Sequence, residues 1–162
     1  MPASGLNHVS ISAADLDESI GFYRDLFSME PLPTPNFGFP VQWLRLGPNQ
    51  LHLFKREGAV PTYHHLALTV DDFEQVYERA MQRGAFDRTT FGHHLYQLPG
   101  DVAQLYLRDP GGNLVEVDIA GATELPASIR RDMKALADVF PQSEENLRAT
   151  LFHGTGPQLL AS

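Results

Sequence analysis

The sequence predicts an α+β protein in which two modules, each a strand, a helix and three further strands, precede a C-terminal helical extension. The first observation is an internal repeat: residues 8–16 and 65–73 match in kind at every position but one (Ala14 opposite Asp71), with an offset of 57 residues (65 − 8). The second is that both segments alternate apolar residues with small or polar ones, the period-two pattern of half-buried strands. The third is that apolar residues then recur at helical spacing.

The first module follows this order closely. Its expected elements are a strand from residue 8, a helix over residues 16–27, and strands over residues 41–46 and 50–55. Asp15 precedes the helix as a capping acceptor, and Glu18 follows it three residues later. Residues 31–40 are rich in proline, which cannot donate a hydrogen bond to a strand ladder. We therefore expect a loop or a ragged edge strand there.

The second module is the more regular copy. Its expected elements are a strand from residue 65, a helix over residues 72–83, and strands over residues 88–91, 103–108 and 113–119. Gly84 is placed to end the helix. The turns at residues 47–50 and 109–113 correspond to one another, and both contain the glycine and asparagine that hairpins favour.

Beyond Ala120 the repeat ends. The expected organisation is a paired-module domain over residues 1–120, with module one at 5–57 and module two at 62–120, and a C-terminal helical extension over residues 121–162. Helical spacing runs from Ser128 to Phe140, Pro141 interrupts it, and a second short helix is expected over residues 143–152. We expect this amphipathic extension to dock on a module or on a partner subunit.

Composition excludes several classes of function. The chain has 162 residues, which suits one domain, and no cysteine, so a metal ion would have to be held by nitrogen and oxygen ligands. The formal charge of −8 argues against a nucleic-acid or anionic-membrane partner. No secretory leader or membrane-spanning run is evident, so we expect a cytoplasmic protein with a small-molecule substrate.

Potential metal ligands stand at repeat-related positions. His8 and His65 open the two modules, each on the strand face opposite the core. Aligning the two hairpin turns sets Asn49 on Asn113, which places His52 on Glu116. Apolar neighbours flank both of these polar residues, so both leave the face that packs on helices. The four candidates come from the first and last strand of each module, as expected if two curved half-sheets face each other across a pseudo-twofold axis.

The motifs at residues 8–11 (His-Val-Ser-Ile), 22–26 (Phe-Tyr-Arg-Asp-Leu) and 109–116 (Asp-Pro-Gly-Gly-Asn-Leu-Val-Glu) resemble the vicinal oxygen chelate superfamily. This superfamily includes glyoxalase I, methylmalonyl-CoA epimerase, fosfomycin-resistance proteins, extradiol dioxygenases and metal-free bleomycin-binding proteins. The resemblance covers residues 5–120 and implies paired βαβββ modules that form a curved mixed-sheet cleft. It also implies that the metal ligands are His8, His52, His65 and Glu116. The chain departs from glyoxalase-like members at His52, where they usually have Glu or Gln.

This ligand set predicts a particular chemistry. One divalent ion (Ni, Co, Mn, Zn or Fe) held by imidazole and carboxylate keeps open positions for two adjacent substrate oxygens. Chelation stabilises charge on those oxygens and lowers the barrier to proton abstraction beside a carbonyl. Glu116 is the candidate catalytic base, which would accept the proton and return it to the neighbouring carbon. The predicted outcome is a lyase or isomerase reaction of the glyoxalase or epimerase type.

Two other functions stay open at this stage. An extradiol ring-cleaving dioxygenase would hold Fe(II) with only His8, His65 and Glu116, leaving three positions for a catecholate and O₂. Ligation by His52 would leave too few positions for that reaction. A metal-free drug-binding protein would instead stack a flat ligand on aromatic residues, and it has no chemical need for the four ligands to converge.

The remaining expectations concern minor residues and assembly. Further residues that could line the cleft are Trp43, Arg45, Tyr106 and Asp118. The pair at residues 93–94 is assigned to a glycine-flanked loop rather than to the site. Paired-module proteins of this size commonly dimerise, so a homodimer is expected, with the metal ligands contributed by one chain or by two.

Overall fold

The computed structural model describes residues 5–149 and 151. The chain divides into two compact units, one ending at Leu66 and completed by Arg108–Leu114, the other formed by Ala67–Leu107 and the chain from Val115 onward. Each unit contains one open sheet, so the fold is α+β, as predicted.

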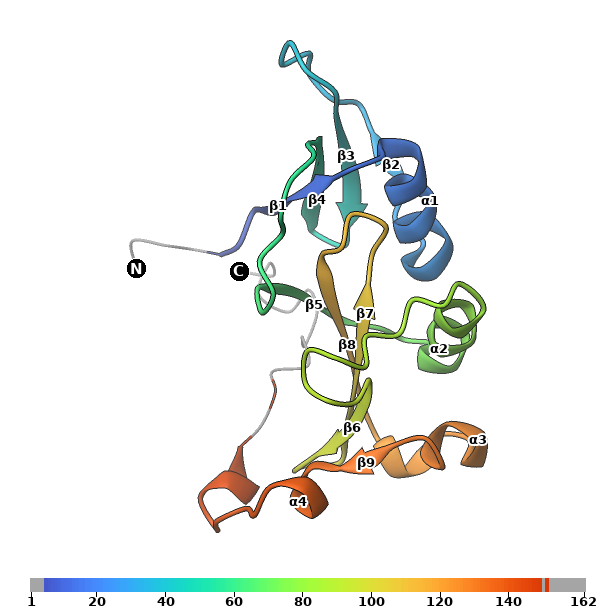
Figure 1. The fold of residues 1–162 in the computed structure, drawn as a ribbon, viewed down its shortest axis with the longest axis vertical. Helices are drawn as coiled ribbons and strands as arrows, with labels where there is room; N and C mark the ends of the chain where they lie inside the picture. The colour runs from blue at the N-terminus through green and yellow to red at the C-terminus, as the bar shows by residue number, and fades with distance from the viewer. Residues whose placement is uncertain (1–4, 150, 152–162) are drawn as a thin grey trace, which may run out of the picture. The chain divides into compact units, whose positions relative to one another are not determined.

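The first unit is a four-stranded sheet covered by one helix (Figure 1). Its elements are β1 (His8–Ala13), α1 (Leu16–Phe27), β2 (Pro31–Leu32), β3 (Val41–Leu46) and β4 (Asn49–Lys55). The strand order is β1-β4-β3-β2, with β1 parallel to β4 and the other neighbours antiparallel. Apolar side chains of α1 and of the strands beneath it form the buried core, among them Phe22, Tyr23, Leu26, Leu44, Leu51 and Leu53.

The second unit contains the other sheet. Its elements are β5 (His65–Thr69), which begins at the boundary between the units, α2 (Phe73–Gln82), β6 (Leu95–Leu98), β7 (Val102–Arg108) and β8 (Leu114–Ala120). The strand order is β5-β8-β7-β6-β9, in which β9 (Lys134–Ala135) comes from the C-terminal extension. Strands β7 and β8 are buried over most of their length, and they carry the core of this unit.

Both long helices begin after a capping carboxylate, predicted at Asp15 and found by the structure at Asp72, which was expected as the first helical residue. Asp15 accepts a hydrogen bond from the Glu18 backbone N–H at 2.9 Å, and Asp72 accepts one from the Gln75 N–H at 2.9 Å. These carboxylates satisfy backbone donors that the first turn of a helix leaves without partners. Helix α2 ends just before Gly84, whose φ of +64° reverses the chain.

The predicted strand over residues 88–91 is wrong. The segment is bent, and the second strand of the module lies later, at β6. The Asp87 side chain accepts hydrogen bonds from the backbone N–H groups of Thr89 and Thr90, at 2.8 and 3.0 Å. A side chain that bonds its own following backbone competes with strand pairing, which explains the turn.

The single helix predicted from Ser128 to Phe140 is also wrong. The chain forms η1 (Ala122–Glu124), α3 (Ala127–Arg130), the strand β9 and then α4 (Leu136–Val139). Strand β9 pairs in parallel with β6, matching Tyr96 to Lys134 (Figure 1). This pairing gives the backbone a tertiary alternative to helical hydrogen bonds, which overrides the helical pattern. The extension therefore docks on module two. Docking on a module was one of the two positions expected for it.

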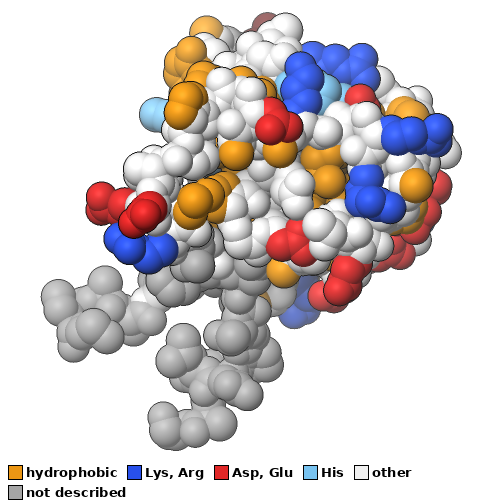
Figure 2. All heavy atoms as spheres, turned by 90° about the horizontal axis from the view of Figure 1, so that it is seen from below, with side chains coloured by type: hydrophobic (Ala, Val, Ile, Leu, Met, Phe, Trp, Pro, Cys, Tyr) orange, Lys and Arg blue, Asp and Glu red, His pale blue; other side chains and the backbone are white. Residues whose placement is uncertain are grey.

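The second short helix, predicted over residues 143–152, is reduced to a single turn. The structure shows η2 (Asn146–Arg148) in this segment, and residues 150 and 152 of the prediction lie outside the described residues. In the described part of the chain, each helix is too short or too polar to cross a membrane. Basic, acidic and hydrophobic side chains intermix on the face shown in Figure 2, so this face presents mixed charge.

Candidate metal centre

Two of the predicted ligands lie together in the first unit. His8 on β1 and His52 on β4 stack with their ring centroids 4.2 Å apart and their planes inclined by 14°. The register explains the contact, since Ser10 is the β1 partner of His52 and His8 lies two residues earlier on the same face. On the other side of His52, its β3 partner Trp43 stacks at 4.5 Å and 8°.

This stack buries His52, although the sequence placed the residue only on the face opposite the core. Leu51 and Leu53 are fully buried, so His52 leaves their face as predicted. His52 is nevertheless only 6% exposed, because the flanking rings cover it. Burial, and then the neighbouring His8, lower the pKa of His52. At neutral pH this histidine is uncharged, which is the state that binds a metal ion.

Hydrogen bonds fix the tautomers of three predicted ligands. His8 Nδ1 donates to the Asn7 side-chain oxygen at 2.8 Å, which leaves the lone pair on Nε2. His65 Nδ1 donates to the backbone oxygen of Tyr63 at 2.9 Å, again leaving the lone pair on Nε2. In His52 the roles are reversed, since Nε2 lies 2.8 Å from the Gln50 side-chain oxygen and Nδ1 carries the lone pair. Metal-ligating histidines usually have this arrangement, so these residues fit a divalent ion.

The fourth predicted ligand, Glu116, lies on β8 in the second unit. It is 5% exposed, between the fully buried Val115 and Val117. Burial, and then the charge of Glu116, raise the pKa of Asp118 to about 7. Burial, and then the charge of Glu116, also raise the pKa of Tyr106 far above its ordinary value. A buried pair of carboxylates is costly unless a proton or a cation compensates it, and the raised pKa of Asp118 means that a proton is partly held there near neutral pH.

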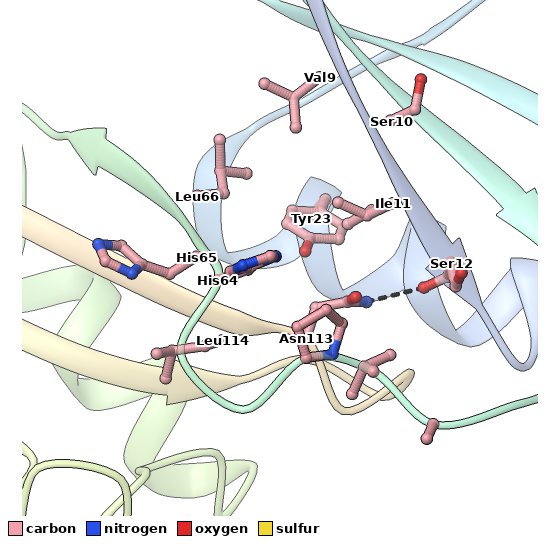
Figure 3. Close-up of a pocket in the computed structure, with 13 residues that line it drawn as sticks. Val9, Ser10, Ile11, Ser12, Tyr23, His64, His65, Leu66, Asn113 and Leu114 are labelled. Atoms are coloured by element: carbon pink, nitrogen blue, oxygen red, sulfur yellow. Dashed lines mark hydrogen bonds between the residues drawn. The ribbon is translucent and has the colours of Figure 1, made fainter.

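A cavity of about 260 Å³ lies in the first unit beside His65. Its walls come from β1, α1, residues 59–61, residues 64–66 and residues 113–114, and Figure 3 shows the side chains of Tyr23 and Asn113 between β1 and the segment of His64 and His65. The Asn113 amide donates to the Ser12 carbonyl at 2.7 Å. The sequence motifs at residues 8–11, 22–26 and 109–116 contribute several of the lining residues, whereas Ala59, Val60 and Pro61 were not singled out from the sequence.

Tyr23, which lines this pocket, forms a buried hydrogen-bonded pair with Asp109. The Tyr23 hydroxyl donates to Asp109 at 2.9 Å, and burial, then Asp109, raise the pKa of Tyr23. Asp109 also accepts hydrogen bonds from both nitrogens of Asn113, yet burial outweighs them and raises the pKa of Asp109. The pair ties α1 to the turn before β8 and stays protonated to higher pH than either group would in water.

One further ligand cluster was missed from the sequence. Among the described residues, His93, His94 and Asp132 form a group of three potential ligand atoms that all lie within 4.8 Å of one another. The histidine pair was visible, but Asp132 stands far along the chain in a segment predicted to be helical. The pairing of β9 with β6 brings Asp132 close to the two histidines, and no local sequence pattern predicts this pairing.

Comparisons with known proteins agree with this architecture. The family model of the Glyoxalase/Bleomycin resistance protein/Dioxygenase superfamily matches residues 5–117. Metallothiol transferase FosB of Shouchella clausii (strain KSM-K16) is 28% identical over 120 residues, covering 70% of this chain and 79% of FosB. Mitochondrial methylmalonyl-CoA epimerase of Bos taurus is 26% identical over 134 residues, covering 71% of this chain and 74% of the epimerase.

A solved structure gives the same result. The crystal structure of lactoylglutathione lyase from Agrobacterium tumefaciens aligns with a TM-score of 0.56 and 26% identity, covering 77% of this chain and 100% of that chain. By name, these three relatives are a transferase, an epimerase and a lyase, so the chain is similar to enzymes of several reaction types. On the family match over most of its length, the chain belongs to the Glyoxalase/Bleomycin resistance protein/Dioxygenase superfamily.

Proposed function

We propose that this protein is a divalent-metal-dependent enzyme that acts on a small substrate with two adjacent oxygens, by proton transfer of the glyoxalase or epimerase type. The proposed ligands of one ion are His8, His52, His65 and Glu116. The observation that carries the proposal is the hydrogen bond from Nδ1 of both His8 and His65 to an oxygen acceptor. Each bond selects the tautomer in which Nε2 has a lone pair for a metal ion.

The residues of the chain have separate roles in this proposal. Imidazoles of His8, His52 and His65 bind the ion, and the lowered pKa of His52 keeps that ring neutral. When bound, the ion supplies Lewis-acid stabilisation of negative charge on the two substrate oxygens. Glu116 accepts a proton from the carbon beside the carbonyl and returns it to the neighbouring carbon.

The alternative is an Fe(II) ring-cleaving dioxygenase, a reaction included in the description of the superfamily. It needs only His8, His65 and Glu116, since three open positions must receive a bidentate catecholate and O₂. The stack of His52 on His8 favours the proton-transfer reaction, because it places a second imidazole beside the first. A metal-free drug-binding protein is the third candidate, and wild-type protein that holds no metal even after reconstitution would support it.

The test is the metal content of protein purified without chelator, compared between the wild type and single variants. We expect His8→Ala and His52→Ala each to lose about one ion per chain relative to the wild type. His64→Ala is the matched control, because it removes an exposed imidazole next to His65 without touching the proposed set. Iron retained in His52→Ala would support the dioxygenase, and no change in metal content in either variant would contradict the proposed site.

Activity is tested separately from binding. With the metal-loaded protein, we expect exchange of a carbon-bound proton for solvent deuterium in a 2-hydroxy or 2-acyl carbonyl substrate. Glu116→Gln removes the base and should lower this exchange by about 10²-fold to 10⁴-fold. Oxygen consumption with a catechol in place of exchange would overturn the proton-transfer assignment. We also propose a homodimer, which sedimentation equilibrium would show as twice the chain mass.

A further inference from the structure

We propose that His93, His94 and Asp132 form a second metal site, for a borderline divalent ion such as Zn²⁺. The three residues belong to the second unit, where His93 and His94 lie just before β6 and Asp132 lies between α3 and β9. Their potential ligand atoms all lie within 4.8 Å of one another. Two imidazoles and one carboxylate, with no thiolate, suit Zn²⁺, Co²⁺ or Ni²⁺ better than Ca²⁺ or Mg²⁺.

The strongest evidence is the state of His94. Its side chain is fully buried, and its ring stacks on Phe86 with the centroids 4.4 Å apart. Within the described residues, Nε2 of His94 has no hydrogen-bond partner of acceptable geometry, although it lies 2.9 Å from Oδ2 of Asp132. A buried polar atom without a hydrogen bond is costly, and coordination of an ion between these two atoms would remove that cost.

The other two residues are held in matching positions. The Tyr77 hydroxyl donates to Oδ2 of Asp132 at 2.7 Å, which orients the carboxylate. Nε2 of His93 donates a hydrogen bond to the backbone oxygen of Asp132 at 2.6 Å, which leaves the lone pair of this ring on Nδ1. Hydrogen bonds of this kind to a ligating carboxylate are typical of metal sites. The Asp132 side chain is 40% exposed, so an ion can enter from solvent.

The position of the site suggests a structural role. Asp132 belongs to the extension, and the two histidines belong to the loop that leads into β6. An ion bound by all three would join these segments next to the short β6–β9 pairing. Because the ion binds only the folded arrangement, it would stabilise the docked extension.

A substitution of Arg88 can distinguish a metal site from a cluster that is held only by hydrogen bonds. The Nε atom of Arg88 donates a hydrogen bond to Nδ1 of His94 at 3.4 Å, which favours the tautomer with the proton on Nε2, and the positive charge of Arg88 repels a cation in the cluster. If the cluster binds metal, Arg88→Met should bind Zn²⁺ more tightly than the wild type does. If the cluster is only a network of hydrogen bonds, the same variant removes one contact and gains no metal affinity.

The test is a count of zinc ions per chain, on the full chain loaded with Zn²⁺ alone and then dialysed. We expect His93→Gln and Asp132→Asn each to lose about one ion relative to the wild type. These variants are preferred to a His94 substitution, because His94 is fully buried and its loss could unfold the unit. His64→Gln, which removes an exposed histidine outside the cluster, is the control and should lose none.

The first proposed site is examined in the same experiment with His8→Ala, which leaves the second cluster intact. The single variant His8→Ala is then compared with the double variant His8→Ala/His93→Gln. An ion that the single variant keeps and the double variant loses would support the second site, independently of the result for the first site. Equal zinc contents in the wild type, His93→Gln and Asp132→Asn would overturn the second site. The result for His8→Ala alone bears on the proposed enzyme site, so the two proposals fail separately.

Discussion

Asp87 shows how one buried carboxylate sets the local backbone. It is 4% exposed and accepts hydrogen bonds from the Thr89 hydroxyl at 3.0 Å and the Thr90 hydroxyl at 2.6 Å, besides both backbone N–H groups. Burial alone would raise the pKa of Asp87, but the hydrogen bonds from Thr90 and Thr89 outweigh it and lower the pKa. The ionised carboxylate therefore stabilises the folded state.

The pH dependence of this contribution can be measured. A lowered folded pKa means that the stabilisation is present above the ordinary value of 3.8 and is lost as the pH falls toward the folded pKa. We expect Asp87→Asn to lower the free energy of unfolding by about 1.5–3 kcal/mol at pH 7, because it weakens charge-assisted hydrogen bonds. The difference from the wild type should shrink below about pH 4.

Urea unfolding at pH 7 and pH 3 would measure both values, provided that the protein is folded at each pH. Asp71→Asn is the control, since Asp71 is exposed and should change the free energy of unfolding little at either pH. A difference for Asp87→Asn that is equal at the two pH values would contradict the account.

At the scale of elements, the turn before β8 is fitted closely against β1. The Asn113 side chain donates to the Ser12 carbonyl, and the same oxygen would lie 2.8 Å from a Cβ atom added at Gly111. Backbone atoms of a paired strand cannot easily move away from such a contact. Glycine is therefore required at residue 111 for close approach rather than for an unusual backbone angle.

Two glycine substitutions should have opposite effects on stability. Gly111→Ala is expected to lower the free energy of unfolding by about 1–3 kcal/mol, because the added methyl group overlaps the Ser12 carbonyl. Gly21→Ala, inside α1 with nothing within 4 Å of the added Cβ, should raise it by about 0.5–1 kcal/mol. Chemical denaturation of both variants would measure the two changes, and equal signs would contradict this interpretation.

At the scale of the whole molecule, the extension completes the second sheet. Strand β9 covers the outer edge of β6, and Ile129 of α3 is 2% exposed. An uncovered strand edge is a site for aggregation, and burial of an isoleucine side chain contributes about 1.5–3 kcal/mol. The extension is therefore expected to be part of the stable fold of its unit.

A chain that ends at Ala120 tests this expectation. It lacks β9 and Ile129, so we expect a lower thermal unfolding midpoint and faster amide hydrogen exchange in β6. A chain that ends at Pro141 keeps α3, β9 and α4, and it serves as the matched control with nearly unchanged values. Equal exchange rates in β6 for the two truncated chains would show that the extension does not protect the sheet.

Local patterns in the sequence were sufficient for most of the architecture. The period-two segments predicted β1 and β5, the capping carboxylate of Asp15 marked the start of α1, and Gly84 marked the end of α2. These elements depend on interactions between residues close in the chain, which a sequence displays directly. The repeat also identified His8, His52, His65 and Glu116 as candidates, and their joint ligation stays a prediction.

Tertiary structure decided the features that depend on distant residues. Only the fold shows that Trp43 and His8 enclose His52, because this burial comes from strand register across three strands. Only the fold shows that residues 134–135 leave a helical pattern to pair with β6 and bring Asp132 to His94. The sequence determined the two modules and their polar faces, whereas long-range pairing, which has no local signature, determined which side chains meet.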